Sequence, residues 1–212
     1  MYTLSPPIWR EPKQARSEQR FEAILTAAKE IIVEKGLEGL QMRELSKQAN
    51  VPIGTLYHFF DNRDAILAYL ASRYLTWQDH EISKRFNKID SVDGWLNAVK
   101  GAGFIFYERN LQDPAIAEIW RAASPSNAVR QIDNASTQRH TKLLFDMLRP
   151  FLPTHVTDED LTILCQMVCE LTATAIRMAL QLPKEKGVLY INQFEEMVRA
   201  RLAELMKENK SS

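Results

Sequence analysis

Apolar residues recur at helical spacing along most of this chain, and prolines separate the runs. The first run begins near Ser17 and places apolar residues on one helical face, at Phe21, Ile24, Leu25, Ala28, Ile31 and Ile32. Proline is tolerated at helix ends but not in helix interiors, so borders are expected at Pro114, Pro125, Pro150, Pro153 and Pro183. Glycine, which punctuates turns and hairpins, is scarce, at 7 of 212 residues. The pattern predicts an all-α fold of about nine helices.

The expected helices have identifiable ends. The first helix ends at Gly36, two short helices cover 41–48 and 52–60, and Asn62 caps a long helix that runs to about Phe86. Ser91 caps the next, and Thr157 with Asp160 resembles a capping box. The later helices are expected at 92–110, 114–122, 126–149, 158–182 and 191–208. Residues 1 to 14 contain three prolines and are interpreted as a mobile arm.

Charge and cysteine content restrict where the protein acts. Its 27 basic and 27 acidic residues cancel, so net charge gives no sign of a nucleic-acid or membrane partner. Cys165 and Cys169 lie in one apolar stretch, which favours a reducing compartment and buried structural thiols. No signal peptide is recognised, and within the most apolar stretch, 161–183, the longest charge-free run is 161–169, which is far shorter than the ~20 residues that span a bilayer. We therefore expect a cytoplasmic protein without a membrane partner.

The sequence contains no constellation for catalysis or cofactor binding. Gly101 and Gly103 begin a GxG, but no third glycine follows at the required spacing. The 4 histidines are widely separated, and the 2 cysteines supply fewer ligands than zinc requires. We expect no catalytic residue, no metal and no cofactor, and the protein is not expected to be an enzyme.

The two short helices at 41–48 and 52–60 carry the most specific signal. Only 49–51 separate them, and Asn50 is the residue best suited to a positive φ at such a joint. This is a helix-turn-helix pattern, in which the second helix enters the major groove of DNA. The expected DNA contacts are the outward-facing residues Gln41, Arg43, Lys47, Ile53, Gly54, Thr55, Tyr57, His58 and Arg63. Arg10, Lys13 and Arg16 of the arm are expected to add phosphate contacts.

An ordinary αα-hairpin with a polar surface would give a similar pattern. Residues 1–64 hold nine basic and nine acidic side chains, so local charge does not decide the matter. DNA binding requires Glu22, Glu30, Glu34 and Glu38 to lie away from the bound duplex.

The run 40–64 resembles the signature of the TetR (tetracycline-repressor-type) family of bacterial regulators. The matching residues are Gly36, Arg43, Ala49, Val51, Gly54, Leu56, Tyr57, Phe60, Arg63 and Asp64. The sequence departs from the family pattern at Gln41, Met42, Ser46, Asn50 and Pro52. The resemblance implies a helix-turn-helix DNA-binding domain at 15–64 and an effector-binding and dimerisation domain at 65–212. It also implies a homodimer that binds a palindromic operator, usually as a repressor, and that a small molecule releases.

The helices at 158–182 and 191–208 are expected to form the dimer interface. The stretch 161–182 is apolar on nearly all sides, so one side must meet the bundle core and another needs a partner. Together the two helices could build a four-helix interface across a twofold axis. The residues expected there are Leu164, Val168, Leu171, Phe194, Val198 and Leu202.

Aromatic residues, methionines and two arginines in the second domain are candidates for an effector pocket. They are Phe104, Tyr107, Trp120, Arg121, Met147, Met167, Arg177 and Met178, and they favour a small apolar or aromatic effector. Arg177 could instead pair with Glu170 or with a carboxylate of the partner subunit. One alternative function stays open, that of a helical-bundle carrier or sensor of small molecules that no longer binds DNA.

Overall fold

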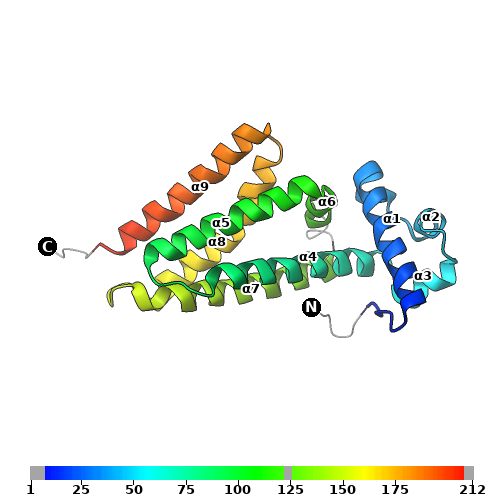
Figure 1. Cartoon of the computed structure of the whole chain (residues 1–212), viewed down its shortest axis with the longest axis horizontal. Helices are drawn as coiled ribbons and strands as arrows, with labels where there is room; N and C mark the ends of the chain where they lie inside the picture. The colour runs from blue at the N-terminus through cyan, green and yellow to red at the C-terminus, as the bar shows by residue number, and fades with distance from the viewer. Residues whose placement is uncertain (1–7, 122–125, 208–212) are drawn as a thin grey trace. The chain divides into compact units, whose positions relative to one another are not determined.

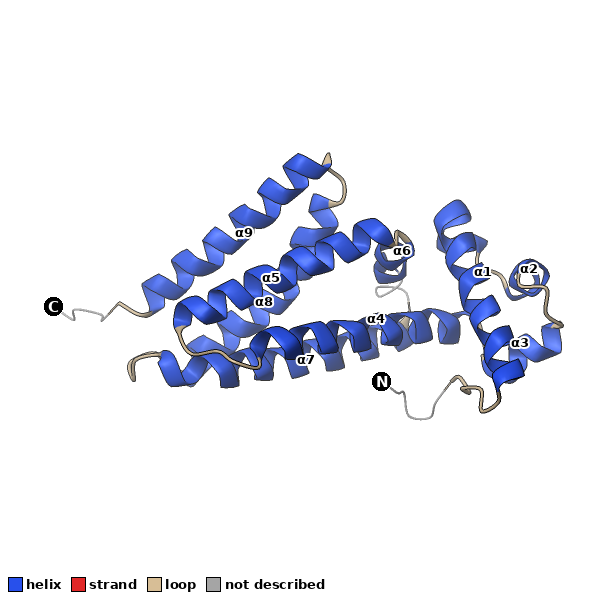
Figure 2. Ribbon diagram, in the orientation of Figure 1, coloured by secondary structure: helices blue, strands red, loops and turns tan. Residues whose placement is uncertain are grey.

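The computed structural model describes residues 8–121 and 126–207. In these ranges the chain forms nine α-helices and one short 3₁₀ helix. Figures 1 and 2 show how the α-helices follow one another. The predicted all-α class is therefore confirmed.

The chain divides into two compact units. The first comprises Met1–Trp77 and Asp113–Asn134, and the second comprises Gln78–Gln112 and Ala135–Ser212. The division falls inside two long helices, α4 (Arg63–Phe86) and α7 (Asn127–Leu148). The functional boundary expected between residues 64 and 65 stays a prediction, since compactness alone groups part of α4 with the N-terminal helices.

The first unit is organised around helix α1 (Ala15–Gly39). Helices α2 (Met42–Gln48) and α6 (Ala115–Arg121) pack on α1, and α3 (Ile53–Phe59) packs on α2. Gly36 has φ 67° and interrupts the helical geometry of α1. Asn62 caps α4, because its Oδ1 accepts a hydrogen bond of 2.9 Å from the amide of Ala65. The positive φ of Gly36 and the cap at Asn62 both confirm the helix ends predicted from the sequence.

Large side chains fill the core of the first unit. Phe21 is 2% exposed, stacks on Phe60 at 5.0 Å between ring centroids and meets the edges of Phe59 and Tyr69. The aliphatic side chains predicted for the inner face of α1 are buried around it, with Leu45 and Leu56 of α2 and α3. Burying each such side chain stabilises the fold by about 1.5–3 kcal/mol.

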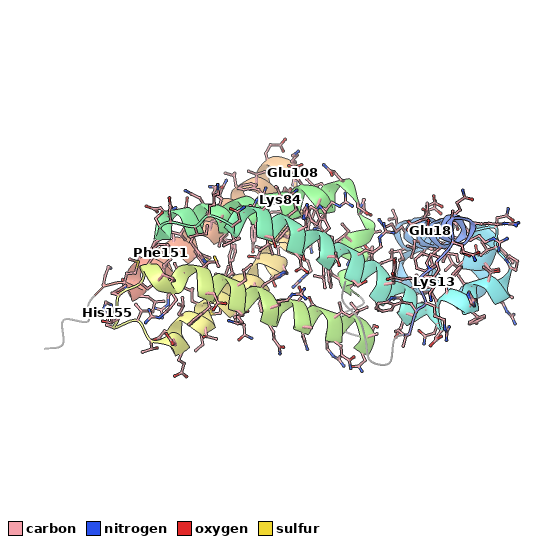
Figure 3. The ribbon with its side chains drawn as sticks, turned by 60° about the horizontal axis from the view of Figure 1, so that its bottom comes forward. Lys13, Glu18, Lys84, Glu108, Phe151 and His155 are labelled. Atoms are coloured by element: carbon pink, nitrogen blue, oxygen red, sulfur yellow. The ribbon has the colours of Figure 1, made fainter. Side chains whose placement is uncertain are left out.

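The second unit contains α5 (Val92–Gln112), a 3₁₀ turn (Arg149–Phe151), α8 (Asp158–Ala179) and α9 (Lys184–Leu205), with the adjoining parts of α4 and α7. Helix α5 packs on both α8 and α9, and α8 packs on α9. The Trp95 indole is buried and donates 3.1 Å to the carbonyl of Leu144. His155, labelled in Figure 3, donates 3.2 Å to the carbonyl of Leu205 at the end of α9.

Two caps of the second unit were predicted correctly. Ser91 Oγ accepts from the amide of Gly94 at 3.0 Å, and Thr157 Oγ1 accepts from the amide of Asp160 at 3.1 Å. The capping box differs in detail from the usual one, because the Thr157 hydroxyl donates to the Asp160 carboxylate at 2.6 Å.

The start of α9 was predicted wrongly. The helix begins at Lys184, directly after Pro183, and not at residue 191. The missing side chain of Gly187 serves packing in this first part of α9, because a Cβ there would lie 2.3 Å from Tyr107 Oη and 2.8 Å from the Ala179 carbonyl. The constraint arises between α5, α8 and α9, so local sequence does not reveal it.

The N-terminal segment is ordered further than predicted. Residues 1–7 lie outside the described residues, but Trp9 is 5% exposed and forms an isolated antiparallel bridge with Phe60. The expectation of a mobile arm to residue 14 is therefore wrong for residues 8–10. The indole of Trp9 explains the difference, because it packs edge-on against Tyr69 at 5.6 Å.

Helix α8 is, among the helices of the described ranges, the one long and apolar enough to cross a membrane by length and composition. Core helices of globular proteins pass the same test, and one side of α8 packs inside the second unit, burying Leu161 and Cys165. Burial raises the pKa of Cys165 to about 12 and that of Cys169 to about 11. Both thiols are therefore protonated at neutral pH, as expected of structural cysteines.

Candidate nucleic-acid interface

The joint between α2 and α3 is short and fixed by hydrogen bonds. Asn50 has φ 51°, as predicted for the residue that reverses the chain. Ser46 Oγ donates 2.7 Å to the carbonyl of Val51, whose amide donates 3.1 Å to the carbonyl of Ser46. The inner residues Leu45 and Leu56 are fully buried. The two helices are therefore held at one mutual angle, which a helix-turn-helix needs.

The outer face of this pair presents most of the predicted DNA-contacting residues. The exposed ones are Gln41, Arg43, Lys47, Ile53, Gly54, Tyr57 and His58, while Thr55 and Arg63 are half-buried. Tyr57 and Ile53 are 49% and 40% exposed, although both are large and carry apolar surface. Their exposure on α3 suits contacts with base edges and thymine methyl groups.

Arg63 differs from the other cations of this group. Its Nη1 donates 3.5 Å to the carbonyl of Leu37, and its Nε lies 3.9 Å from Asp64. In the part of the chain that the structure describes, neither Arg43 nor Lys47 forms a hydrogen bond or an ion pair with another side chain. Both cations are therefore available to an external anion.

Three acidic side chains of the first unit, Glu22, Glu30 and Glu44, are paired with neighbours inside the unit. Lys35 donates 2.9 Å to Glu44, and this bond, with the charge of Lys35, lowers the pKa of Glu44. Arg73 contacts Glu22 at 2.8 Å, and Gln48 donates 2.9 Å to Glu30. This pairing reduces the repulsion that unpaired carboxylates would exert on DNA.

The N-terminal cations are placed differently from one another. Arg10 donates 3.2 Å to the carbonyl of His58 and lies 3.2 Å from Asp61. Lys13, labelled in Figure 3, and Arg16 are exposed near the start of α1. The predicted phosphate contact by Arg10 thus competes with bonds inside the protein. Trp9 was missed, although a large aromatic residue beside Ile8 in an otherwise polar arm is the signal that could have revealed it.

The eight residues predicted for an effector pocket are divided between the two units, with Trp120 and Arg121 in the first and the other six in the second. Trp120 packs on Tyr74 within the first unit, and Arg121 pairs with Glu118 at 2.6 Å. Arg177 donates 2.8 Å to Thr174, instead of pairing with Glu170 as expected. Met167 and Met178 are 51% and 47% exposed on α8. The remaining three, Phe104, Tyr107 and Met147, are half-buried or buried but line neither of the cavities described below.

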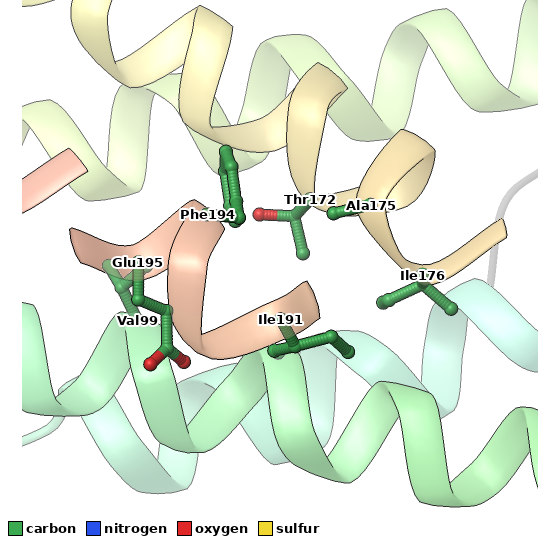
Figure 4. Close-up of a pocket in the computed structure, with 8 residues that line it drawn as sticks. Val99, Thr172, Ala175, Ile176, Ile191, Phe194 and Glu195 are labelled. Atoms are coloured by element: carbon green, nitrogen blue, oxygen red, sulfur yellow. The ribbon is translucent and has the colours of Figure 1, made fainter. Parts of the chain in front are cut away.

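A small cavity lies between α5, α8 and α9, as Figure 4 shows. It is lined by Val99, Gly103, Thr172, Ala175, Ile176, Ile191, Phe194 and Glu195 and encloses about 10 Å³, the size of one water molecule. Lys100 Nζ lies 3.2 Å from Glu195 Oε2, without the direction of a good hydrogen bond. Burial raises the pKa of Glu195, and Lys100 opposes that effect.

An open groove of about 450 Å³ lies between α7 and α8. Most of its lining residues are of polar type, and the lining consists of Thr137, Gln138, Thr141, Lys142, Phe145, Asp146, Thr162 and Gln166. No three His, Cys, Asp or Glu side chains in residues 8–121 and 126–207 are grouped so that they could hold a metal ion.

The predicted dimer residues lie mostly on the wrong side of their helices. Leu164, Val168, Val198 and Leu202 are buried inside the second unit, and Phe194 is half-buried in the cavity lining. Only Leu171 is exposed, at 39%. The apolar side chains that point outward are Ile163, Met167, Leu171 and Met178 on α8, with Leu189 and Met197 on α9. We call these six residues the outer apolar face. The sequence shows that α8 is apolar on two sides but not which side packs inward.

Comparisons with known proteins agree with the geometry of the helix pair. Residues 24–70 match the model of "Bacterial regulatory proteins, tetR family", and residues 93–206 match that of "Tetracyclin repressor-like, C-terminal domain". The chain is similar to the HTH-type transcriptional regulator PksA of Bacillus subtilis, with 38% identity over 58 residues, 27% of this chain and 28% of that protein. The chain covers half or less of the length of the curated relatives that it matches.

Solved structures share the fold over most of the chain. A TetR-family regulator from Streptomyces coelicolor superposes with a TM-score of 0.65 and 23% identity, covering 88% of this chain and 99% of that one. The regulator FadR from Bacillus subtilis, solved with stearoyl-CoA, gives 0.65 and 18%, covering 84% and 97%. The C-terminal family model alone covers more than half of the sequence. The chain therefore belongs to the TetR family of bacterial transcriptional regulators.

Proposed function

We propose that this regulator represses transcription by binding a palindromic operator as a homodimer, with α3 in the major groove. The observation that carries the proposal is the outer face of α2 and α3. There Arg43 and Lys47 are free for phosphates or guanine, and Tyr57 and His58 are exposed on the helix that follows the fixed turn at Asn50. The family is not enzymatic, and DNA binding in the cytoplasm accounts for this surface.

The outer apolar face supports a homodimer. Six exposed apolar side chains on two helices that pack on each other are typical of a protein–protein interface. A second copy would cover the face across a twofold axis, as in a four-helix interface. The twofold axis would present two α3 helices to two half-sites about 34 Å apart, or a multiple of that distance.

We further propose that a small, mainly apolar effector releases the operator. The cavity between α5, α8 and α9 has an apolar lining, with only Thr172 and Glu195 as polar side chains. Because it encloses about the volume of one water molecule, an effector would have to bind a more open conformation. The similar FadR structure holds stearoyl-CoA, which makes long-chain acyl compounds the first ligands to try. An effector acts only if it binds the DNA-competent and DNA-incompetent states with different affinities.

The test of DNA binding is a fluorescence-anisotropy titration of the full chain against DNA from upstream of its own gene, at several salt concentrations. Specific binding predicts an affinity that exceeds that for scrambled DNA and that falls steeply with salt. Arg43→Ala is expected to weaken operator binding about tenfold to a hundredfold, without a change in dimer mass. Lys88→Ala, which removes an exposed cation outside the helix pair, serves as the matched control.

Equal affinity for operator and scrambled DNA would overturn the proposal. If such a protein still bound acyl compounds, the alternative of a small-molecule carrier or sensor would replace it. If Arg43→Ala and Lys88→Ala weakened binding equally, the assigned face would be wrong even though DNA binding itself were real.

A further inference from the structure

Helix α3 is short and depends on contacts from outside itself. It has seven residues, and its N-terminal cap, Pro52, offers no side-chain hydrogen bond. The last carbonyl groups of any helix have no partner within the helix and need one elsewhere. At the C-terminal end of α3, these groups include the carbonyls of His58 and Phe59.

Residues 8–10, which we call segment 8–10, supply those partners from 48 residues away in sequence. The amide of Arg10 donates 2.8 Å to the carbonyl of Phe59, and the amide of Asp61 donates 3.2 Å to the carbonyl of Ile8. Arg10 Nη1 donates to the carbonyl of His58 and to Asp61 Oδ1, each at 3.2 Å. The loop that leads into α1 therefore runs past the end of α3 (Figure 2).

Trp9 anchors this segment to the core of the first unit. Its side chain is 5% exposed and meets the edge of the Tyr69 ring, which in turn packs on Phe21 and Phe60. Because Trp9 packs on Tyr69 of α4 and bridges to Phe60, the segment from which Arg10 bonds to α3 is itself held in place. A charged donor at a helix C-terminus is also favoured by the helix dipole.

The charge of Arg10 has a second consequence at this end of α3. Asp61 directly follows the helix and is 44% exposed, so its carboxylate would repel a phosphate nearby. Arg10 pairs with it. The family sequence model begins at residue 24, so segment 8–10 lies outside the part of the head that the family defines.

We propose that segment 8–10 is a positioning element for the DNA-reading helix, and that Arg10 raises operator affinity through His58 and Asp61 without contacting DNA. The proposal rests on the proposed function for its DNA readout. The structural part, that Arg10 holds the end of α3, can be measured on the free protein.

The experiment compares Arg10→Met with Lys13→Met, an exposed cation three residues away with no bond to another side chain in the described ranges. Arg10→Met is expected to speed amide hydrogen exchange at the end of α3 and at Asp61 and to weaken operator binding about tenfold. The slope of log affinity against log salt should stay the same, because no phosphate contact is lost. Lys13→Met should leave amide exchange in α3 unchanged.

Two truncations separate segment 8–10 from the residues before it. A chain that begins at Ile8 should bind the operator as the full chain does, and one that begins at Glu11 should bind at least as weakly as Arg10→Met. In an Asp61→Asn background, the effect of Arg10→Met should shrink, since part of it acts through that carboxylate.

Several results would overturn the inference. A salt slope lowered by about one in Arg10→Met, with unchanged amide exchange, would make Arg10 a direct phosphate contact. A loss already complete in the chain that begins at Ile8 would assign the effect to residues 1–7. If Arg10→Met exchanged its α3 amide hydrogens faster but kept full operator affinity, segment 8–10 would stabilise α3 without influencing DNA binding. If the wild-type chain bound no operator, the proposed function would fail, while the exchange measurement would still test whether Arg10 holds α3.

Discussion

Exposed apolar side chains occur in both compact units, but they are distributed differently. In the described part of the first unit, three large apolar side chains are exposed, and two of them, Ile53 and Tyr57, lie on α3. In the second unit, the outer apolar face spreads over α8 and α9. The comparison indicates a narrow contact surface on a closed core in one unit and a broad uncovered surface in the other. Each type of surface fits its proposed partner, a DNA groove in the first case and a second copy in the second.

The closed core of the first unit predicts the largest effect of a single substitution. Phe21→Ala removes a ring that contacts three other aromatic rings, so the free energy of unfolding of this unit should fall by about 3–5 kcal/mol. Urea denaturation followed by tryptophan fluorescence measures the change, since three of the 4 tryptophans, Trp9, Trp77 and Trp120, lie in this unit. Val33→Ala, 51% exposed on the same helix, should change it by no more than about 0.5 kcal/mol. Similar effects of both substitutions would contradict the assignment of the core.

The second unit has one tight contact that predicts the next largest effect. Gly187→Ala places a Cβ within 2.3 Å of Tyr107 Oη and 2.8 Å of a backbone carbonyl, so the start of α9 must shift. The unit should lose about 1–3 kcal/mol of stability, measured by denaturation and by amide exchange in α9. Tyr107 Oη is buried without a hydrogen-bond partner, so Tyr107→Phe should itself be tolerated and should relieve part of the effect. A Gly187→Ala protein as stable as wild type would show that α9 does not pack here.

The surroundings of Phe21 and of Gly187 also show which structural features the sequence predicts and which it does not. The inner face of α1, the positive φ of Asn50 and the caps at Asn62 and Ser91 depend on nearby residues, and all were predicted. The start of α9 was predicted wrongly, and the packing that requires a glycine at position 187 involves Tyr107, 80 residues away.

The surfaces proposed for DNA binding and for dimerisation differ in the same way in how well the sequence predicts them. The residues proposed to contact DNA follow from the register of two short helices, and most of them are exposed. For α8, periodicity identifies two apolar sides, and only packing against α5 decides that Leu164 and Val168 face inward. Trp9 was missed because its partners, Phe60 and Tyr69, lie more than 50 residues along the chain.

The broad uncovered surface predicts a smaller effect on folding but a clear one on assembly. Met167→Glu places a charge in the centre of the outer apolar face, where the side chain is 51% exposed. The unfolding free energy of the isolated unit should change by no more than about 0.5 kcal/mol, while dimerisation weakens about tenfold or more. Sedimentation equilibrium measures the dimer constant. Leu111→Glu, at an exposed leucine of α5 that is not one of the six residues of this face, should leave the constant unchanged, and equal effects would disprove the interface.

The smallest predicted effect concerns the buried carboxyl group of the second unit and depends on pH. Burial raises the pKa of Glu195 above its usual value of 4.5, so the folded chain binds this proton more tightly than the unfolded chain does. As pH rises from 4.5 through the raised pKa, the group therefore lowers the stability of the second unit. Glu195→Gln removes this dependence, and the variant should gain stability relative to wild type across that window and keep a constant advantage above it. Urea denaturation between about pH 4 and pH 8 measures the difference. Glu196→Gln, at an exposed neighbour, should show no such trend, and a pH-independent difference for Glu195→Gln would mean that Lys100 keeps the carboxylate charged in spite of its burial.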